Sequence, residues 1–379
     1  LGLDLEGYGA LQPRVTPTLP TQREGSRYQR IYSGPAGIDP YAAAVSDVYQ
    51  DLFGEGSYIG KGIYDVDAFE AALAGRAPEN ALLSHDLFEG LFARTGLVTD
   101  IELFEEFPSS YEVAASRQHR WARGDWQLLP WILRGRAAGA IPTRIPGIAR
   151  WKMLDNLRRT LSAPATVLTL LAGWTVPGAS PAAWTGFVLL ATALPALIPP
   201  FLELVRPRPG VSKRVHVRAV AHGLALSGSQ IACHLMFLAH QAWLMSDAVV
   251  RTLVRLLLTR RTMLEWVTAA RAKAGLGLEV GGTYRRMGGA IALTIAVAVL
   301  VALVAPERLP FAAPFIALWL LSPLGARWVS HPTPTYPVER LSPSESRTLR
   351  STARRTWRFF ETLIGPTDNH LPPDNFQED

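Results

Sequence analysis

The sequence predicts an α/β domain followed by an α-helical membrane region. Two observations lead to this fold class: more than half of the acidic residues precede Glu112, and apolar residues concentrate after Leu161. A hydrocarbon core is crossed by roughly 20 mostly apolar residues, and several runs after Leu161 approach that length. The 379 residues leave room for two or three domains. We expect the following organisation: a head at 1–147, a membrane-surface helix at 148–160, a membrane region at 161–330 and a linker helix within 331–379.

The head alternates strand-like and helix-like patterns, as an α/β layer does. Short apolar runs bounded by glycine or proline predict strands at 9–15 and 96–104. Helical spacing predicts helices at 37–53, 67–74 and 123–134. Residues 54–64 are rich in glycine and indicate a loop or a strand. We expect only part of a sheet.

Residues 148–160 mix tryptophan and aliphatic residues with basic ones, a pattern typical of a helix on a membrane surface. Four apolar runs are predicted to cross the bilayer, at 161–176, 183–204, 288–305 and 311–329. Residues 222–258 are helical in pattern but contain histidine, glutamine and charged residues. This favours an interfacial or cavity-lining helix, with a fifth crossing as the alternative. After Pro343, residues 345–363 predict a basic helix with one apolar face.

The net charge of +6 does not indicate a nucleic-acid partner, because of where the basic residues lie. They gather in the links at 206–218 and 251–286, whereas the short links at 177–182 and 306–310 contain only Arg308. By the positive-inside rule this asymmetry places the head and the basic links in the cytoplasm. The single cysteine, Cys233, has no partner for an intramolecular disulfide.

Asp86 is the first candidate catalytic residue. It follows the short apolar pair 82–83 and precedes a helix-like run, so its carboxylate would emerge at the carboxyl edge of a sheet, where open α/β sheets bind ligands. A helix cap is the alternative. His85, Asp86 and Glu89 could also contribute metal ligands, but no further ligand cluster accompanies them.

Two further motifs have chemical meaning. The glycines at 54–62 differ from a phosphate-binding loop, because Gly62 follows Lys61 where Ser or Thr is required, yet they would let a sugar approach the backbone. An ordinary tight turn is the alternative. Arginines and tryptophans also cluster within 117–126. Arginines can neutralise a diphosphate and an indole can stack on a sugar ring, although a basic aromatic belt at the membrane has the same composition.

Taken together, the motifs resemble membrane-integrated inverting glycosyltransferases of the cellulose and hyaluronan synthase type. Tyr58-Ile-Gly-Lys-Gly62 matches their acceptor loop, Ser84-His85-Asp86 their catalytic triplet, and Arg117-Gln118-His119-Arg120-Trp121 their Gln-x-x-Arg-Trp motif with Arg in place of Gln. Longer stretches, such as Ser84-His-Asp-Leu-Phe-Glu-Gly and His119-Arg-Trp-Ala-Arg-Gly-Asp-Trp-Gln, are similar to the cyclic β-1,2-glucan synthases. The resemblance covers essentially the whole chain.

The resemblance implies roles for individual residues. Asp86 would be the general base that activates the acceptor hydroxyl of a β-glucan as it attacks UDP-glucose. The expected substrate-binding residues are Gly60, Lys61, His85, Arg117, Gln118, Arg120, Trp121 and Asp125. Arg117, Arg120 and Gln118 would hold the UDP diphosphate, and Trp121 would stack beneath the acceptor sugar.

The resemblance also implies features outside this sequence. The head would be the later part of a GT-A glycosyltransferase domain. A divalent cation, Mg²⁺ or Mn²⁺, would be bound mostly by residues before Leu1, and a phosphorylase-like region would follow Asp379. We expect both ends to be truncations, the piece to be inactive alone, and the protein to lie in the bacterial inner membrane with several spans. Two alternatives stay open: a related polysaccharide synthase of another linkage, and a non-catalytic glucan export or scaffold subunit.

Overall fold

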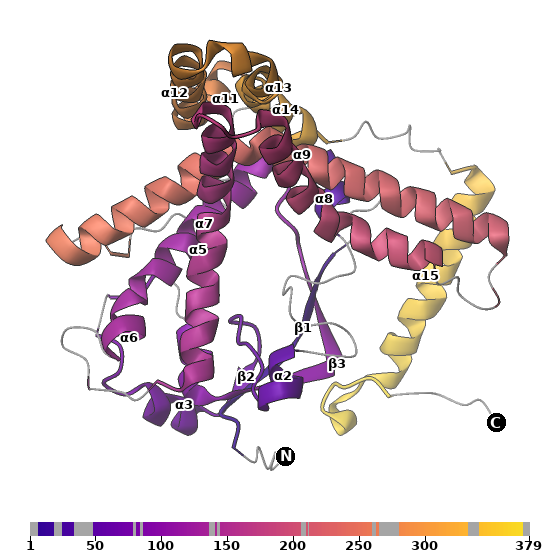
Figure 1. The fold of residues 1–379 in the computed structure, drawn as a ribbon. Coiled ribbons are helices and arrows are strands. Elements are labelled where there is room, and N and C mark those ends of the chain that lie inside the picture. Colours follow the sequence, from indigo (N-terminus) through magenta and orange to yellow (C-terminus); the bar gives the residue numbers. More distant parts are fainter. Residues whose placement is uncertain are drawn as a thin grey trace. The chain divides into compact units, whose positions relative to one another are not determined.

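The computed structural model describes residues 7–18, 25–33, 48–78, 81–83, 86–135, 141, 145–205, 210, 212–259, 263–264, 280–332 and 341–373. The chain divides into two compact units, Leu1–Thr333 and Pro334–Asp379. The first unit combines a small sheet with many helices (Figure 1). His85 and the start of the helix expected at 37–53 lie outside the described residues.

Among the described residues, the sheet has three strands in the order β2-β1-β3. The strands are β1 (Ala10–Pro17), β2 (Ile63–Tyr64) and β3 (Thr95–Glu105). β1 and β3 run side by side in parallel, and their register shifts between Pro13 and Arg14, where proline cannot donate to a ladder (Figure 1). The strands predicted at 9–15 and 96–104 are confirmed. Three strands establish a small mixed sheet but do not by themselves identify a GT-A fold.

Short helices connect and flank these strands. They are α1 (Arg27–Tyr32), α2 (Val48–Phe53), α3 (Val66–Leu73) and α4 (Asp86–Ala93). α3 confirms the helix predicted at 67–74, and the side chain of Asp65 accepts from the backbone N–H of Ala68 at its start. The strand expected at 82–83 is wrong. The N–H of Leu83 donates instead to Oε1 of Gln127 at 2.6 Å, so this segment joins no ladder.

The helix predicted at 123–134 is two helices, α5 (Tyr111–Gln127) and α6 (Leu129–Arg134). α5 begins earlier than predicted because the Ser110 side chain caps it by accepting from the N–H of Val113. The break at Leu128 has a simple cause: Pro130, in the first turn of α6, has no N–H to continue the helical ladder. The whole arginine–tryptophan motif therefore lies on one helix.

The surface helix expected at 148–160 and the first span expected at 161–176 form one uninterrupted helix, α7 (Gly147–Thr175). No helix-ending residue separates the two parts, and Pro164 is accommodated inside the helix. α8 (Pro181–Val205) follows. The stretch at 222–258 belongs to a longer helix, α9 (Lys213–Val254), which ends in a π-helical turn, η1 (Arg255–Thr259).

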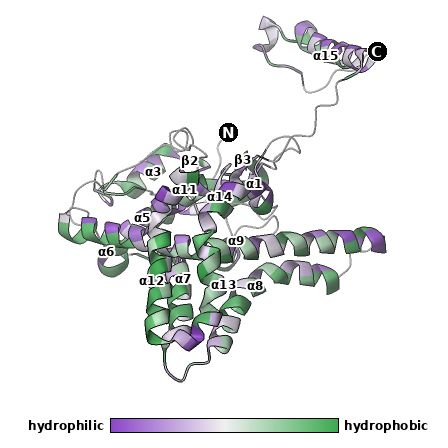
Figure 2. Cartoon of the chain, turned by 90° about the horizontal axis from the view of Figure 1, so that it is seen from above, coloured by the Kyte–Doolittle hydropathy of each residue, from purple (hydrophilic) through white to green (hydrophobic). Residues whose placement is uncertain are grey.

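The last helices of the first unit are α11 (Val280–Arg286), α12 (Gly288–Val304), η2 (Pro306–Arg308), α13 (Leu309–Leu320) and α14 (Ser322–Ser330). Together, α7, α8, α9, α12 and α13 bury an apolar core that includes Leu170, Trp174 and Trp319. Figure 2 shows α7, α12 and α13 side by side, with mostly hydrophobic residues on α12 and α13.

In the part of the chain that the structure describes, α8 alone is a single helix long and apolar enough to cross a membrane. Two bent pairs also qualify if each pair is one span: α11 with α12, bent by 68°, and Pro306–Leu320 with α14, bent by 45°. The candidates thus number one to three, against the four spans expected. The expected span at 161–176 is the one that does not qualify, because these residues continue the polar first half of α7. α9 is not among the candidates either.

The second unit contains α15 (Pro343–Leu363) and a short 3₁₀ turn, η3 (Pro366–Asp368). A capping box between Ser342 and Glu345 begins α15. The predicted basic helix is confirmed, and its apolar residues Leu349 and Trp357 are exposed.

Gly90 is a position where this packing leaves no room for a side chain. A β-carbon there would lie 2.3 Å from Cβ of Tyr58 and 2.8 Å from Oγ1 of Thr95. We expect Gly90→Ala to destabilise the protein by about 1–3 kcal/mol through overpacking. Gly228→Ala is the matched control, since Gly228 is also helical and has open space around it. Thermal unfolding in detergent gives the melting temperature of each variant. Equal melting temperatures for Gly90→Ala and Gly228→Ala would contradict the expectation.

Candidate functional site

A cavity of about 680 Å³ lies between the head and the helices α7 and α9. Residues of α1, α2, the loop at 57–61, α4, β3, α5, α7 and α9 line it. Six residues predicted from the sequence are among them: Lys61, Asp86, Arg117, Gln118, Trp121 and Asp125. Arg120 is on α5 but is not part of the lining, and His85 lies outside the described residues. The structure therefore brings together motifs that are far apart in the chain.

Asp86 is the first residue of α4, and the described residues before it, 81–83, form no strand, so the sheet-edge position predicted for it is wrong. The glycine loop lies directly against its carboxylate: a β-carbon on Gly60 would be 2.7 Å from Oδ1 of Asp86. Gly60 also has a φ of +75°, which disfavours any other residue. Burial raises the pKa of the neighbouring Tyr58, and the charges of Glu89 and Asp86 add to this effect.

Gln12, on β1, forms two hydrogen bonds with the same loop. Its Nε2 donates to the carbonyl of Lys61 at 2.8 Å, and its Oε1 accepts from the N–H of Ile59 at 3.0 Å. Gln12 is only 2% exposed, so both contacts are shielded from water. A β-carbon on Gly62 would lie 2.0 Å from the carbonyl oxygen of Leu11. The loop thus needs glycine on both sides of Lys61.

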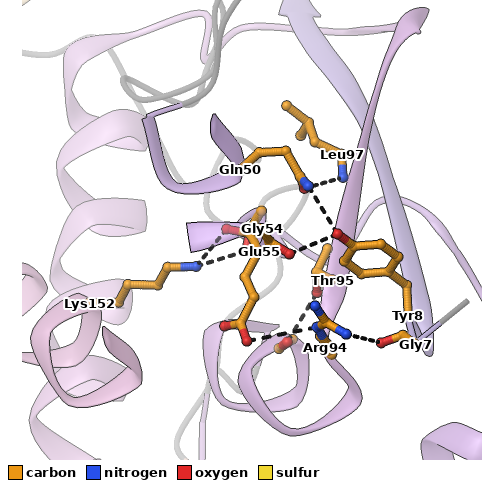
Figure 3. Close-up of polar contacts among 11 residues, drawn as sticks. Gly7, Tyr8, Gln50, Gly54, Glu55, Arg94, Thr95, Leu97 and Lys152 are labelled. Atoms are coloured by element: carbon orange, nitrogen blue, oxygen red, sulfur yellow. Dashed lines mark hydrogen bonds and ion pairs between the residues drawn. The ribbon is translucent and has the colours of Figure 1, made fainter. Parts of the chain in front are cut away.

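Lys152 of α7 holds the beginning of the loop. Its Nζ donates to the carbonyls of Gly56 at 2.8 Å and Glu55 at 3.3 Å (Figure 3). On the other side of this segment, the Tyr8 hydroxyl donates to the carbonyl of Gly54, and Gln50 donates to that hydroxyl (Figure 3). The sequence does not indicate Gln12 or Lys152 as site residues, because neither lies in a motif. Their contacts are also distant in the chain: Gln12 and Lys61 are 49 residues apart, and Lys152 and Gly56 are 96 residues apart.

Arg117, Trp121 and Asp125 lie four residues apart on α5 and therefore share one face of the helix. The Arg117 guanidinium lies 4.3 Å from the centroid of the Trp121 ring. Its Nη2 is 3.9 Å from Oε1 of Glu105, which also forms an ion pair with Lys61. Glu105 thus links the motif helix to the glycine loop, a role with no signal in the sequence. Burial lowers the pKa of Arg117, whereas Glu105 raises it.

Polar contacts attach α5 to α9. The buried hydroxyl of Tyr111 shares a hydrogen bond of 2.7 Å with Nδ1 of His240, and Tyr111 stacks on Phe237 at a centroid distance of 3.8 Å. Further along, Nε2 of His119 lies 2.8 Å from Oδ2 of Asp247. Two polar residues of the 222–258 stretch, His240 and Asp247, therefore have partners on α5.

The first half of α7 forms another wall of the cavity through Lys152, Asp155, Asn156 and Arg159. The sequence indicated a helix on a membrane surface, and in the structure these four polar residues line the cavity. Nδ2 of Asn156 donates to Oδ1 of Asp125 at 3.0 Å, which joins α7 to the motif helix. Trp126 adds a second link by donating to Oγ1 of Thr160 at 2.9 Å.

Metal ligands were expected mostly outside this sequence. Within the described ranges, no group of three or more His, Cys, Asp or Glu side chains could hold a metal ion. Asp86 and Glu89, considered as ligands above, therefore form no such group with the described residues.

Burial raises the pKa of Asp125 to about 6, although the hydrogen bond from Asn156 and the charge of Arg159 oppose the increase. The unfolded value is about 4. Protonated Asp125 therefore stabilises the folded state fully below about pH 4, and this contribution to the free energy of unfolding is lost as the pH rises through about 6. Asp125→Asn cannot titrate, so its melting temperature should fall less than that of the unsubstituted protein between pH 4 and 7. Parallel pH profiles of the two proteins would contradict the raised pKa.

Comparison with known proteins gives one informative result. No protein-family model matches the chain. The cyclic beta-(1,2)-glucan synthase NdvB of Rhizobium meliloti (strain 1021) is 45% identical to it over 374 residues, which cover 98% of this chain. The chain spans about 13% of the length of that relative. The resemblance inferred from the motifs is thereby confirmed: along nearly its whole length the chain is homologous to one segment of a cyclic β-(1,2)-glucan synthase.

Proposed function

We propose that the chain forms the acceptor side of a glycosyltransferase active site that extends β-1,2-glucan from UDP-glucose with inversion at the anomeric carbon. One observation carries the proposal: Asp86, Lys61, Arg117 and Trp121, from three separate motifs, line the same cavity. The homology to a glucan synthase supports a sugar donor and a glucan acceptor as the substrates. The choice of donor, the linkage and the stereochemistry belong to the proposal.

In this proposal Asp86 is the general base. Its carboxylate accepts the proton of the acceptor hydroxyl while that oxygen attacks the anomeric carbon and UDP leaves. The contact with Gly60 supports this role, because a loop without side chains at that point lets a sugar ring approach the carboxylate. Trp121 offers an indole face on which the acceptor ring stacks.

The donor diphosphate requires positive charge. Arg117 and Lys61 line the cavity and share the carboxylate of Glu105, so a bound diphosphate would compete with Glu105 for both cations. Gln118 lines the cavity beside them. Arg120 does not, and we therefore assign the main diphosphate contact to Arg117. A divalent cation, Mg²⁺ or Mn²⁺, would neutralise the leaving group, but the described residues do not form a site for it.

We also propose that α8 and the bent helix pairs lie in the bacterial inner membrane, with the head in the cytoplasm. The candidate spans and the basic links between apolar runs support this arrangement. A phosphorylase-like region elsewhere in the full-length polypeptide would be the partner that acts on the same glucan.

Asp86→Asn tests the proposal in the full-length protein. The amide cannot accept the hydroxyl proton, so we expect glucose transfer from UDP-glucose to fall by at least about a hundredfold, with membrane insertion unchanged. Asp100→Asn is the control, because Asp100 is exposed on β3, away from the cavity lining. Incorporation of radiolabelled glucose into glucan measures both variants. Near-normal synthesis by Asp86→Asn would overturn the assignment.

The two alternatives predict different results. A synthase of another linkage would retain its dependence on Asp86, and NMR of the product would show the linkage directly. A scaffold or export subunit would not require a nucleotide. Binding of UDP by the full-length protein, and its loss in Arg117→Ala, would count against that alternative.

A further inference from the structure

A second group of polar side chains lines the cavity beyond Trp121. The sequence indicated only Asp125 of this group as a substrate-binding residue, and the proposed reaction gives the group no specific role. The group consists of Asp125 on α5 with Asp155, Asn156 and Arg159 on α7. Asn156 donates to Asp125 at 3.0 Å and accepts a hydrogen bond from Nη2 of Arg159. Nε of Arg159 lies 3.5 Å from Oδ2 of Asp155. Side chains from two helices thus form one continuous network along the wall of the cavity.

The charge of this network indicates the class of ligand. The Asp155 side chain is 6% exposed and forms ion pairs with both Arg159 and Arg158, the latter at 2.7 Å. With Arg158 counted as a partner of Asp155, two carboxylates and two guanidinium groups carry no net formal charge, although Arg158 itself is exposed and does not line the cavity. A phosphate or a metal ion would therefore find no excess of opposite charge, whereas the mixture of donors and acceptors matches a neutral polyhydroxyl compound.

The position of the network indicates which part of such a ligand it would meet. Asp125 is four residues after Trp121, about 6 Å further along the same face of α5. Trp121 is 36% exposed, and Arg117 covers one side of its ring. A sugar ring stacked on the other side of the indole would extend its hydroxyl groups toward Asp125. Oδ2 of Asp125 accepts no hydrogen bond from any residue that the structure describes, so it can accept one from a hydroxyl.

We propose that Asp125, Asn156 and Arg159 bind the hydroxyl groups of the acceptor glucose unit and thereby determine which hydroxyl faces Asp86. This inference rests on the proposed function and names the specificity determinant of the same site. The secondary hydroxyls of glucose are chemically alike, so the linkage depends on the orientation in which the ring is held. Holding the ring at its other hydroxyls leaves a single one directed at the base.

Asn156→Ala tests the inference because it removes the residue that contacts both Asp125 and Arg159. In the full-length protein, titration calorimetry with a linear β-1,2-linked gluco-oligosaccharide should show affinity weakened by about tenfold, the effect of losing a hydrogen bond or two. The affinity for UDP should change by less than about twofold. NMR of the glucan made by the variant should show linkages other than β-1,2. Ser116→Ala, at an exposed position on α5, is the matched control and should change none of these values.

The outcomes separate the inference from the proposed function. If the unsubstituted protein transfers glucose and binds the oligosaccharide, but Asn156→Ala matches it in affinity and linkage, the inference is wrong and the proposed function stands. If the unsubstituted protein neither binds the oligosaccharide nor transfers glucose, both are wrong. Should Asn156→Ala fail to fold, Asn156→Ser keeps a hydroxyl donor at the site and is measured in the same way, with a smaller expected loss of affinity.

Discussion

The attachment of α5 to α9 is the interaction on which the rest of the cavity depends. Tyr111 begins α5, and its buried hydroxyl bonds to His240 while its ring stacks on Phe237. Each buried hydrogen bond contributes only about 0.5–1.5 kcal/mol, but removing one partner would leave the other unsatisfied in the interior. Eight residues later, His119 bonds to Asp247. Two contacts spaced along a helix define its rotation as well as its position, and the rotation decides which side chains enter the cavity.

With α5 oriented in this way, its stripe of Arg117, Trp121 and Asp125 faces the glycine loop at one end and α7 at the other. Glu105 connects Arg117 to Lys61, and Asn156 connects Asp125 to α7. The wall therefore changes along its length from a cationic end at Arg117 and Lys61 to an end where the charges of acidic and basic side chains balance. Such a gradient suits the proposed reaction, in which a charged nucleotide and a neutral glucan meet at one carboxylate.

Helix α7 contributes side chains both to the cavity and to the apolar core. The second half of α7 packs in that core through Leu170 and Trp174, while its first half presents Lys152 and Asn156 to the cavity. Because the helix has no break, the position of the apolar half determines where the polar half lies. An uninterrupted helix thus couples the glycine loop, held by Lys152, to the helices that include the candidate membrane spans.

The sequence by itself determined which chemical groups are available and which local structures hold them. The strands β1 and β3 and the helix α15 could be predicted, because periodicity and capping residues are local properties. The motifs could be identified from the sequence for the same reason, since motif spacing is also local. The resemblance to cyclic glucan synthases was equally a property of the sequence. The tertiary structure decided what local pattern cannot express. Asp86 begins a helix, and the described residues 81–83 before it form no strand, because Leu83 bonds to Gln127 instead of a neighbouring strand. The polar face of α7 lines a cavity, because α5 lies against it. Gln12 and Glu105 acquire roles only through partners distant in the chain, and such pairings exist only after the chain has folded.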